Sequence, residues 1–415
     1  MKIIDGVNLH LIKTEKFKTN HLTFRFTGER LKKTVAKRVL VAQMLATANA
    51  DFPSSQKLRK TLARLYGTSL STRVSTKGKA HILDIDLEFI SPAYLEKTDF
   101  QHEIFDLLYT ILYKPLITLE QFQSKVFDVE KANLISYLEA DKEDSFYLSE
   151  LGLYDLFYHD DNLKVSKYAR VDLVEQENSF TAYQEFQRML KEDQIDIFLL
   201  GDFEASSVLE EINRFPFQAR KLYRFVNFTQ DRLNITQEKI DRQDDHQSIL
   251  QLGYHLPLTY SHPDYPIALV LNGLLGGFAH SRLFTQVREK EGLAYSISSQ
   301  VHPYTVLLQV YAGIDKRQRE KTLRMINQEW HNLKAGRYSS HLLQQTKQLL
   351  LNDYYLAQDS PKILIERAYN QKYLAKNDEN LPKWPDRIAA VNKADIMQLA
   401  RKIHLQALYY LEGGK

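Results

Sequence analysis

The sequence contains the same order of expected strands and helices twice, and this repetition limits the folds open to it. In the first half a strand, a helix, a loop with a second helix, and two strands cover residues 21–29, 31–49, 51–67, 68–76 and 79–90. In the second half the same kinds of segment cover residues 248–258, 263–277, 281–292, 293–301 and 304–314. Each half closes with an apolar strand followed by glycine, over residues 195–204 and 405–415. The pattern indicates an internal duplication whose residue identities have diverged.

A chain of 415 residues is too long for one hydrophobic core and suits two domains of about 200 residues each. Strands joined by short turns, mixed with helices, predict an α+β fold in which each duplicated domain is a mainly antiparallel sheet covered by helices. The polar segment between the halves predicts domains over residues 1–215 and 246–415. Residues 216–245 are expected to form the linker and the start of the second domain.

The charge balance and the residue types that the chain lacks exclude several functions. Lys and Arg number 55 against 52 Asp and Glu, and the net charge of +3 argues against a nucleic-acid-binding protein. The absence of cysteine excludes disulfides, thiol catalysis and Cys-based metal sites. No apolar run approaches the ~20 residues that span a bilayer, and the N-terminal residues lack the pattern of a signal peptide. We therefore expect a cytoplasmic protein without membrane insertion.

One corner of the second half carries a cation and a phenol that the first half lacks. Arg288 ends a helical stretch, Gly292 stops it, and Tyr295 begins the next strand. When Gly67 is placed on Gly292, Ala63 falls opposite Arg288 and Leu70 opposite Tyr295, so the fold does not require either side chain. From the residues alone two readings stay open. Arg288 can complement the helix dipole or pair with a neighbouring glutamate while Tyr295 packs as a strand aromatic, or both can serve a function.

The stretch "GGFAHSRLFTQVREKEGLAYSISS" resembles the C-terminal signature of the pitrilysin/insulinase-type peptidases, which include the mitochondrial processing peptidases. The resemblance covers essentially the whole chain and implies two domains arranged as a clamshell, with a chamber enclosed by this chain and a zinc-bearing partner chain together. It also implies that Arg288 and Tyr295 reach the scissile peptide. Gly276 and Gly277 match either a glycine loop that lines the substrate channel or a helix C-terminal stop.

Active members of that family carry H-x-x-E-H on a helix of the first half, where two histidines bind zinc and the glutamate activates water. The matching positions here hold Val39, Ala42 and Gln43, so both imidazoles and the base are missing. Glu130 matches the distal zinc glutamate, and Tyr137 stands where a further glutamate occurs. A lone carboxylate is not a zinc site, and Glu130 is expected to be a surface or hydrogen-bonded residue.

The motif has not moved elsewhere in the chain. None of the 13 histidines begins H-x-x-E-H or H-E-x-x-H, and His102, which precedes a glutamate, has Asp106 where the second histidine belongs. His159, Asp160 and Asp161 are adjacent in a loop and do not converge on one side. We expect no metal to be bound by this chain.

The resemblance therefore implies a non-catalytic bacterial member of the family. Such a chain acts as the substrate-binding subunit of a heterodimeric zinc peptidase, and its Arg288 and Tyr295 bind the peptide and stabilise the transition state. The zinc belongs to a paralogous partner subunit, and no independent activity is expected. An exposed edge of the first-half strand pair can take the peptide as an added strand. A homodimer of the isolated chain remains open.

The residues also bear on two other functions. A structural relative with no role in proteolysis has no reason to keep the Arg/Tyr pair. An independent metallopeptidase with an unusual metal site conflicts with the distribution of histidines.

Overall fold

The computed structural model describes residues 1–96, 99–223, 226–244, 247–374 and 383–414. The chain forms two compact units. The first comprises Met1–Ala140, Val165–Val226 and Ile365–Ala368. The second comprises Asp141–Lys164, Asn227–Leu364 and Tyr369–Lys415. The chain therefore passes from the first unit to the second after Val226. In addition, Asp141–Lys164 belongs to the second unit and Ile365–Ala368 to the first, although the chain on either side of each segment belongs to the other unit.

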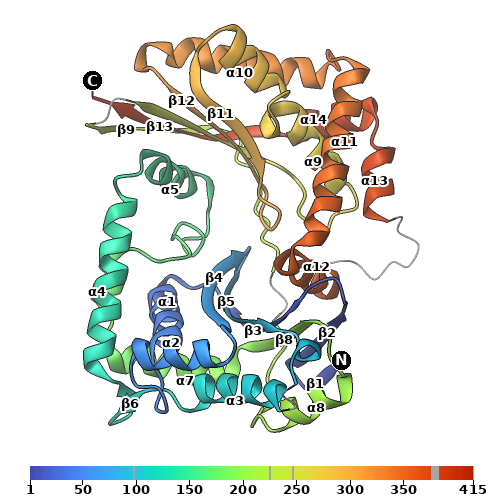
Figure 1. Cartoon of the computed structure of the whole chain (residues 1–415). Coiled ribbons are helices and arrows are strands. Elements are labelled where there is room, and N and C mark those ends of the chain that lie inside the picture. Colours follow the sequence, from blue (N-terminus) through green and yellow to red (C-terminus); the bar gives the residue numbers. More distant parts are fainter. Residues whose placement is uncertain (97–98, 224–225, 245–246, 375–382, 415) are drawn as a thin grey trace. The chain divides into compact units, whose positions relative to one another are not determined.

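The first unit is built on a six-stranded sheet (Figure 1). Its strands are β1 Lys2–Ile4, β2 Val7–Lys13, β3 Thr19–Glu29, β4 Ser69–Lys77, β5 Ala80–Ile90 and β8 Gln194–Gly201. Its helices are α1 Lys32–Thr47, α2 Ser55–Arg64, η1 Pro92–Tyr94, α3 Phe100–Tyr113, α4 Ser124–Asp141, α6 Val171–Glu175, α7 Ser179–Glu192 and α8 Ala205–Asn213. A separate small hairpin pairs β6 Ile117–Thr118 with β7 Gln121–Phe122.

The second unit is built on a five-stranded sheet. Its strands are β9 Gln237–Gln243, β10 Ser248–His255, β11 Ala294–Val301, β12 Leu307–Ile314 and β13 His404–Gly413. Its first helical segments are α5 Ser145–Phe157, α9 Tyr265–Asn272, η2 Gly273–Gly277, η3 Phe284–Lys290, η4 Lys316–Gln318 and α10 Arg319–Lys334. The remaining ones are α11 Ser340–Leu356, η5 Ala357–Asp359, α13 Trp384–Ala390 and α14 Lys393–Lys402. The helix α12 Pro361–Tyr373 is shared, because its residues Ile365–Ala368 belong to the first unit.

The two sheets have the same topology. The first runs β1-β2-β8-β3-β5-β4, and the second, read from its other edge, runs β9-β13-β10-β12-β11. Apart from the additional edge strand β1, the two orders match: β8 lies parallel to β2 and β13 lies parallel to β9, while the other pairings are antiparallel. The predicted α+β class with two duplicated, mainly antiparallel sheets is therefore confirmed.

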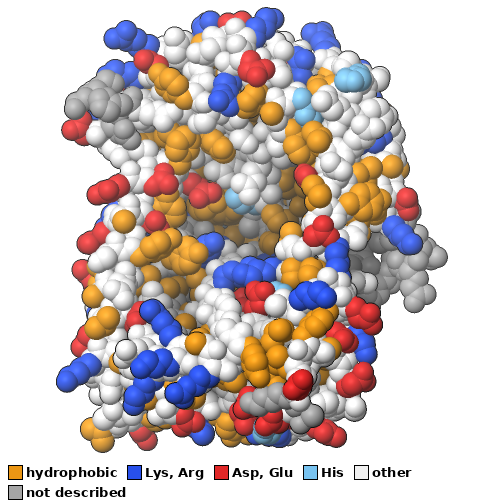
Figure 2. Space-filling model, viewed as in Figure 1, with side chains coloured by type: hydrophobic (Ala, Val, Ile, Leu, Met, Phe, Trp, Pro, Cys, Tyr) orange, Lys and Arg blue, Asp and Glu red, His pale blue; other side chains and the backbone are white. Residues whose placement is uncertain are grey.

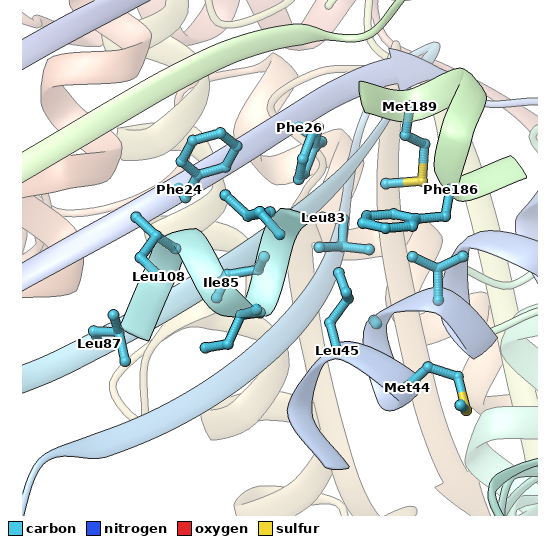
Figure 3. Packing of buried hydrophobic residues seen from close by; sticks show 14 of the residues in the cluster. Phe24, Phe26, Met44, Leu45, Leu83, Ile85, Leu87, Leu108, Phe186 and Met189 are labelled. Atoms are coloured by element: carbon cyan, nitrogen blue, oxygen red, sulfur yellow. The ribbon is translucent and has the colours of Figure 1, made fainter. Parts of the chain in front are cut away.

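The core of the first unit lies between its sheet and one layer of helices. Alternate residues of β3 and β5 point to this layer, as the two-residue period of a strand requires. Figure 3 shows them meeting side chains of α1, α3 and α7. The labelled residues are Phe24, Phe26, Leu83, Ile85 and Leu87 from the strands and Met44, Leu45, Leu108, Phe186 and Met189 from the helices. All ten are almost fully buried.

The second sheet is packed on both faces. One face, with Leu252 and Val310, forms a core with residues of α9, α10 and α14 such as Trp330. On the opposite face Leu153 and Phe157 of α5 pack in a separate cluster with β10 and β13 residues. The segment that carries α5 precedes this sheet by about eighty residues but completes its second layer.

The glycine corner recurs in both units. Gly67, between α2 and β4, has φ +75°, and Gly292, between η3 and β11, has φ +59°. Both conformations favour glycine, and at neither glycine would an added Cβ meet another atom within 4 Å. Backbone geometry alone explains these two glycines.

The face of the first sheet opposite its hydrophobic core carries buried charges. Arg25 is fully buried and donates to both Asp84 carboxylate oxygens, at 2.7 and 2.9 Å. It also pairs with Glu366, which Lys77 approaches at 2.7 Å. Arg73 contributes a further 2.8 Å contact to Asp84. Three cations thus share two carboxylates in this cluster, and each charged group has an oppositely charged partner, as burial requires.

Within the described parts of the chain, no helix combines the length and apolar character needed to cross a bilayer. On the face drawn in Figure 2, basic and acidic side chains both occur on each unit, in keeping with the near-neutral net charge.

Candidate functional site

Two π-helical segments precede the corner that carries the Arg/Tyr pair. The helix that begins as α9 continues through η2, and η3 follows after a short connection. Wider π-type turns are uncommon and occur often at functional sites. Gly292 then turns the chain into β11, an edge strand of the second sheet. This corner therefore differs from its counterpart in the first unit, where α2 is an ordinary α-helix.

Arg288 is exposed in the last turn of η3. Its guanidinium carbon lies 4.6 Å from the ring centroid of Phe284, one turn earlier, in a cation–π contact. Of the two neighbouring glutamates, Glu289 and Glu291, the latter pairs with Lys321 at 3.0 Å. Within the described ranges no ion pair joins Arg288 to a carboxylate. The aromatic ring supports the guanidinium while its N–H groups stay available.

Tyr295 sits at a β-bulge that is absent from the matching corner of the first unit. Ala294 faces Ile314 and Ser296 faces Gly313, so Tyr295 is an extra residue on β11 without a counterpart on β12. At the matching corner Leu70 pairs with Leu87 in an unbroken register. A bulge redirects the local side chain, and Tyr295 is 68% exposed. The phenol thus points to solvent rather than into the hydrophobic core.

Close packing around Gly276 and Gly277 leaves little room for a side chain at either position. A Cβ on Gly276 would lie 2.7 Å from the backbone nitrogen of Ser299, and one on Gly277 would lie 2.7 Å from the side-chain nitrogen of Asn272. Ser298 also donates a 3.0 Å hydrogen bond to the Gly276 carbonyl. The helical path ends directly after Gly277, at Phe278, which is extended. Close approach of η2 to β11 therefore requires Gly276, whatever else the segment does.

The positions of the family's zinc motif do not fit a zinc ion. Val39 and Ala42 are 4% and 5% exposed and belong to the hydrophobic core of the first unit. Gln43 is partly exposed, and its buried Oε1 has no hydrogen-bond partner among the residues that the structure describes. Glu130 accepts a 3.0 Å hydrogen bond from Thr47, one turn beyond Gln43. An apolar pair, an amide and one engaged carboxylate do not supply the three ligands of a catalytic zinc site.

The acidic residues near His102 and His159 form ion pairs with basic side chains. His102 Nδ1 lies 2.8 Å from Glu211 Oε1 and 3.0 Å from Arg214 Nη1. These groups form a surface ion-pair network that includes Asp106. Beside His159, Asp161 pairs with Lys164 at 2.8 Å. Across the described residues, no group of three or more His, Cys, Asp or Glu side chains is arranged to hold a metal ion.

The structure also contains a pocket that the sequence analysis missed. A cavity of about 490 Å³ lies between the start of α5 and the second sheet, entirely within the second unit. We call it the α5–sheet pocket. Its lining residues are Asp144, Phe146, Tyr147, Glu150, Gln251, Ser296, Gln300, Gln309 and Tyr311. The available signal was the set of alternate residues Ser296, Ser298 and Gln300 on β11 and Gln309 and Tyr311 on β12, on the face opposite the core. No local pattern indicated that α5 would cover that face.

Known proteins resemble the chain along its whole length. The family described as "Peptidase M16 inactive domain" matches residues 152–350. The "Probable inactive metalloprotease YmfF" of Bacillus subtilis is 32% identical over 410 residues, which cover 98% of this chain and 96% of that protein. The "Uncharacterized zinc protease YmxG" of the same organism is 30% identical over 169 residues, 40% of this chain and 41% of that protein.

Among solved structures, a conserved protein from Enterococcus faecalis superposes with a TM-score of 0.96 at 34% identity, covering all of this chain and 98% of that one. The full-length match to an M16 relative, the two-sheet fold and the replaced zinc ligands agree with one another. The chain therefore belongs to the M16 peptidase family, of pitrilysin/insulinase type, as a non-catalytic homologue of its zinc proteases.

Proposed function

We propose that the chain is the substrate-binding subunit of a heterodimeric zinc peptidase, in which a paralogous zinc-bearing chain performs the hydrolysis. The observation that carries the proposal is the contrast between the two corners. The second unit alone has an exposed arginine held over an aromatic ring and an exposed tyrosine at a bulge. Zinc protease relatives such as YmxG supply the kind of partner that the proposal requires.

In this role Arg288 and Tyr295 bind the peptide. The guanidinium offers several N–H donors in a planar fork, and the phenol offers one O–H donor. Both can donate to the carbonyl oxygen that gains negative charge during cleavage, or to neighbouring backbone carbonyls. One such donor contributes on the order of 3 kcal/mol to lowering the barrier. The absence of a fitting zinc set in this chain leaves hydrolysis to its partner.

The test is a reconstitution with the zinc-bearing paralogue from the same genome. We expect peptide cleavage by the mixture and none by this chain alone. Arg288→Ala and Tyr295→Phe should each reduce kcat/KM by roughly a hundredfold, because each removes one donor. Lys290→Ala and Tyr66→Phe are matched controls, because Lys290 is exposed beside Arg288 and Tyr66 is exposed at the corresponding corner of the first unit. Both controls should keep full activity.

The same experiment separates the alternatives. If the paralogue cleaves equally well without this chain, the chain is a scaffold. If the mixture needs the chain but tolerates Arg288→Ala and Tyr295→Phe together, the subunit role stands and the pair has been misassigned. Cleavage by this chain alone would contradict the proposal altogether.

A further inference from the structure

The floor of the α5–sheet pocket is a directed chain of hydrogen bonds. His302 Nε2 donates to Gln309 Oε1 at 2.7 Å, Gln309 Nε2 to Gln251 Oε1 at 2.9 Å, and Gln251 Nε2 to Ser149 Oγ at 3.0 Å. Ser149 Oγ then donates to the Phe146 carbonyl at 2.8 Å. The two glutamines are 4% and 2% exposed. Because each amide is fixed at both ends, the floor keeps one shape and one polarity.

Two carboxylates stand at the α5 side of the pocket. Asp144 caps α5, and its Oδ1 accepts from the backbone nitrogens of Phe146 and Tyr147 at 2.9 and 3.2 Å. Glu150 Oε1 accepts from the Tyr154 hydroxyl at 2.7 Å. These bonds orient both groups and use one oxygen of each, which leaves Oδ2 and Oε2 able to accept from a ligand.

The charge of the pocket is uncompensated. Neither lysine nor arginine occurs among its described lining residues. At the same end of α5, partial burial and repulsion from Asp144 raise the pKa of Asp141. A pocket with two oriented carboxylates and no cation attracts a positively charged group.

Aromatic rings from both sides of the pocket meet beside the carboxylates, Phe146 on α5 and Tyr311 on β12. The rings of Phe146 and Tyr311 meet edge to face with centroids 5.6 Å apart. Such rings pack against the aliphatic stem of a long basic side chain, or against the flat face of a guanidinium. The lining therefore offers contacts for both the stem and the charged head of one residue.

We propose that the α5–sheet pocket binds a lysine or arginine side chain of the peptide substrate. The head pairs with Asp144 and Glu150, and the stem lies along Phe146 and Tyr311. This inference rests on the proposed function, in which the chain binds peptides. Ser296, on the pocket wall, directly follows Tyr295 on β11. The pocket therefore selects a residue in the neighbourhood of the peptide bond that the Arg/Tyr pair holds.

The test measures the binding of two fluorescein-labelled decapeptides to the full chain by fluorescence anisotropy. The peptides differ only at one position, which is arginine in the first and glutamine in the second. The test variant combines Asp144→Asn with Glu150→Gln. Asparagine caps a helix as well as aspartate does, so α5 should be retained. Glu143→Gln is the control, because this exposed residue lies on the same turn but does not line the pocket.

We expect the double variant to weaken binding of the arginine peptide by about tenfold and to leave binding of the glutamine peptide unchanged, because only charge-assisted contacts are lost. Arg288→Ala should weaken both peptides equally. If Arg288→Ala weakens both while the double variant weakens neither, the pocket proposal fails and the proposed function stands. If neither change affects either peptide, both proposals fail. Displacement of the arginine peptide by an equal concentration of spermidine would assign the pocket to free polycations and overturn the peptide assignment.

Discussion

Replacing Glu366 with glutamine tests the energetics of the buried charges on the first sheet. The Glu366 side chain is one quarter exposed and pairs with Arg25 and with Lys77, the latter at 2.7 Å. Burial alone would raise the pKa of this carboxyl group. The two cations outweigh burial and lower the pKa from 4.5 to about 2.

The sign and size of the effect on stability follow from the difference between the pKa of Glu366 in the unfolded chain, 4.5, and in the folded chain, about 2. A carboxyl group whose pKa is lower in the folded state stabilises the fold above its unfolded pKa, and the contribution is lost as the pH falls through the folded pKa. For Glu366 the contribution is on the order of 3 kcal/mol at pH 7, because each pKa unit corresponds to about 1.4 kcal/mol. It should decline below about pH 4.5 and disappear near pH 2.

Urea unfolding of the wild type and Glu366→Gln, followed by circular dichroism, measures the difference. Hydrogen exchange of β3 and β5 assigns the loss to the first unit. We expect a loss of roughly 3 kcal/mol at pH 7 that shrinks to about 2 kcal/mol near pH 3.5. The control is Glu204→Gln, which removes an exposed carboxylate 3.3 Å from Lys13 and should cost less than about 1 kcal/mol. A loss that does not change with pH, or one no larger than that of the control, would refute the reasoning.

Three further substitutions test the packing of the fold. Gly292→Ala should cost about 1 kcal/mol in urea unfolding, because only backbone strain opposes the new methyl group; a loss above about 3 kcal/mol would reveal a contact that the structure lacks. Gly276→Ala should cost more, roughly 1–3 kcal/mol, because its methyl group meets the β11 backbone, and equal stability to wild type would contradict that close approach. Phe186→Ala should cost about 3–5 kcal/mol by opening a cavity between α7 and the sheet, and a smaller loss would mean that neighbouring side chains collapse into the space.

Much of the fold followed from apolar periodicity because its strands and helices have one buried face. The predicted strands over residues 68–76 and 79–90 correspond to β4 and β5, and the predicted closing strands correspond to β8 and β13. The strand β9 was not predicted, since its residues are almost all exposed and polar and give no alternation. Its strand conformation comes from pairing with β13, which lies far away in the sequence.

The candidate site was only partly accessible from the sequence. Arg288 and Tyr295 stood out because the duplicated corner has Ala63 and Leu70 instead. The bulge at Tyr295 and the π-helical turns are invisible to periodicity, since they change the hydrogen-bond register without changing the residue pattern. The α5–sheet pocket depends on contacts between residues about 150 positions apart, which no local pattern contains.

The strand order has a consequence for how the protein is made. β8 is the last strand of its sheet to be synthesised, yet it lies between β2 and β3, and β13 likewise lies between β9 and β10. A ribosome must therefore deliver the final ten-residue strand, His404–Gly413, before the second sheet can close. Until then β9 has no neighbour, and one edge of β10 stays open to pairing with other nascent chains. Synthesis of this strand, rather than the emergence of each helix in turn, is therefore the step that permits the second sheet to form completely.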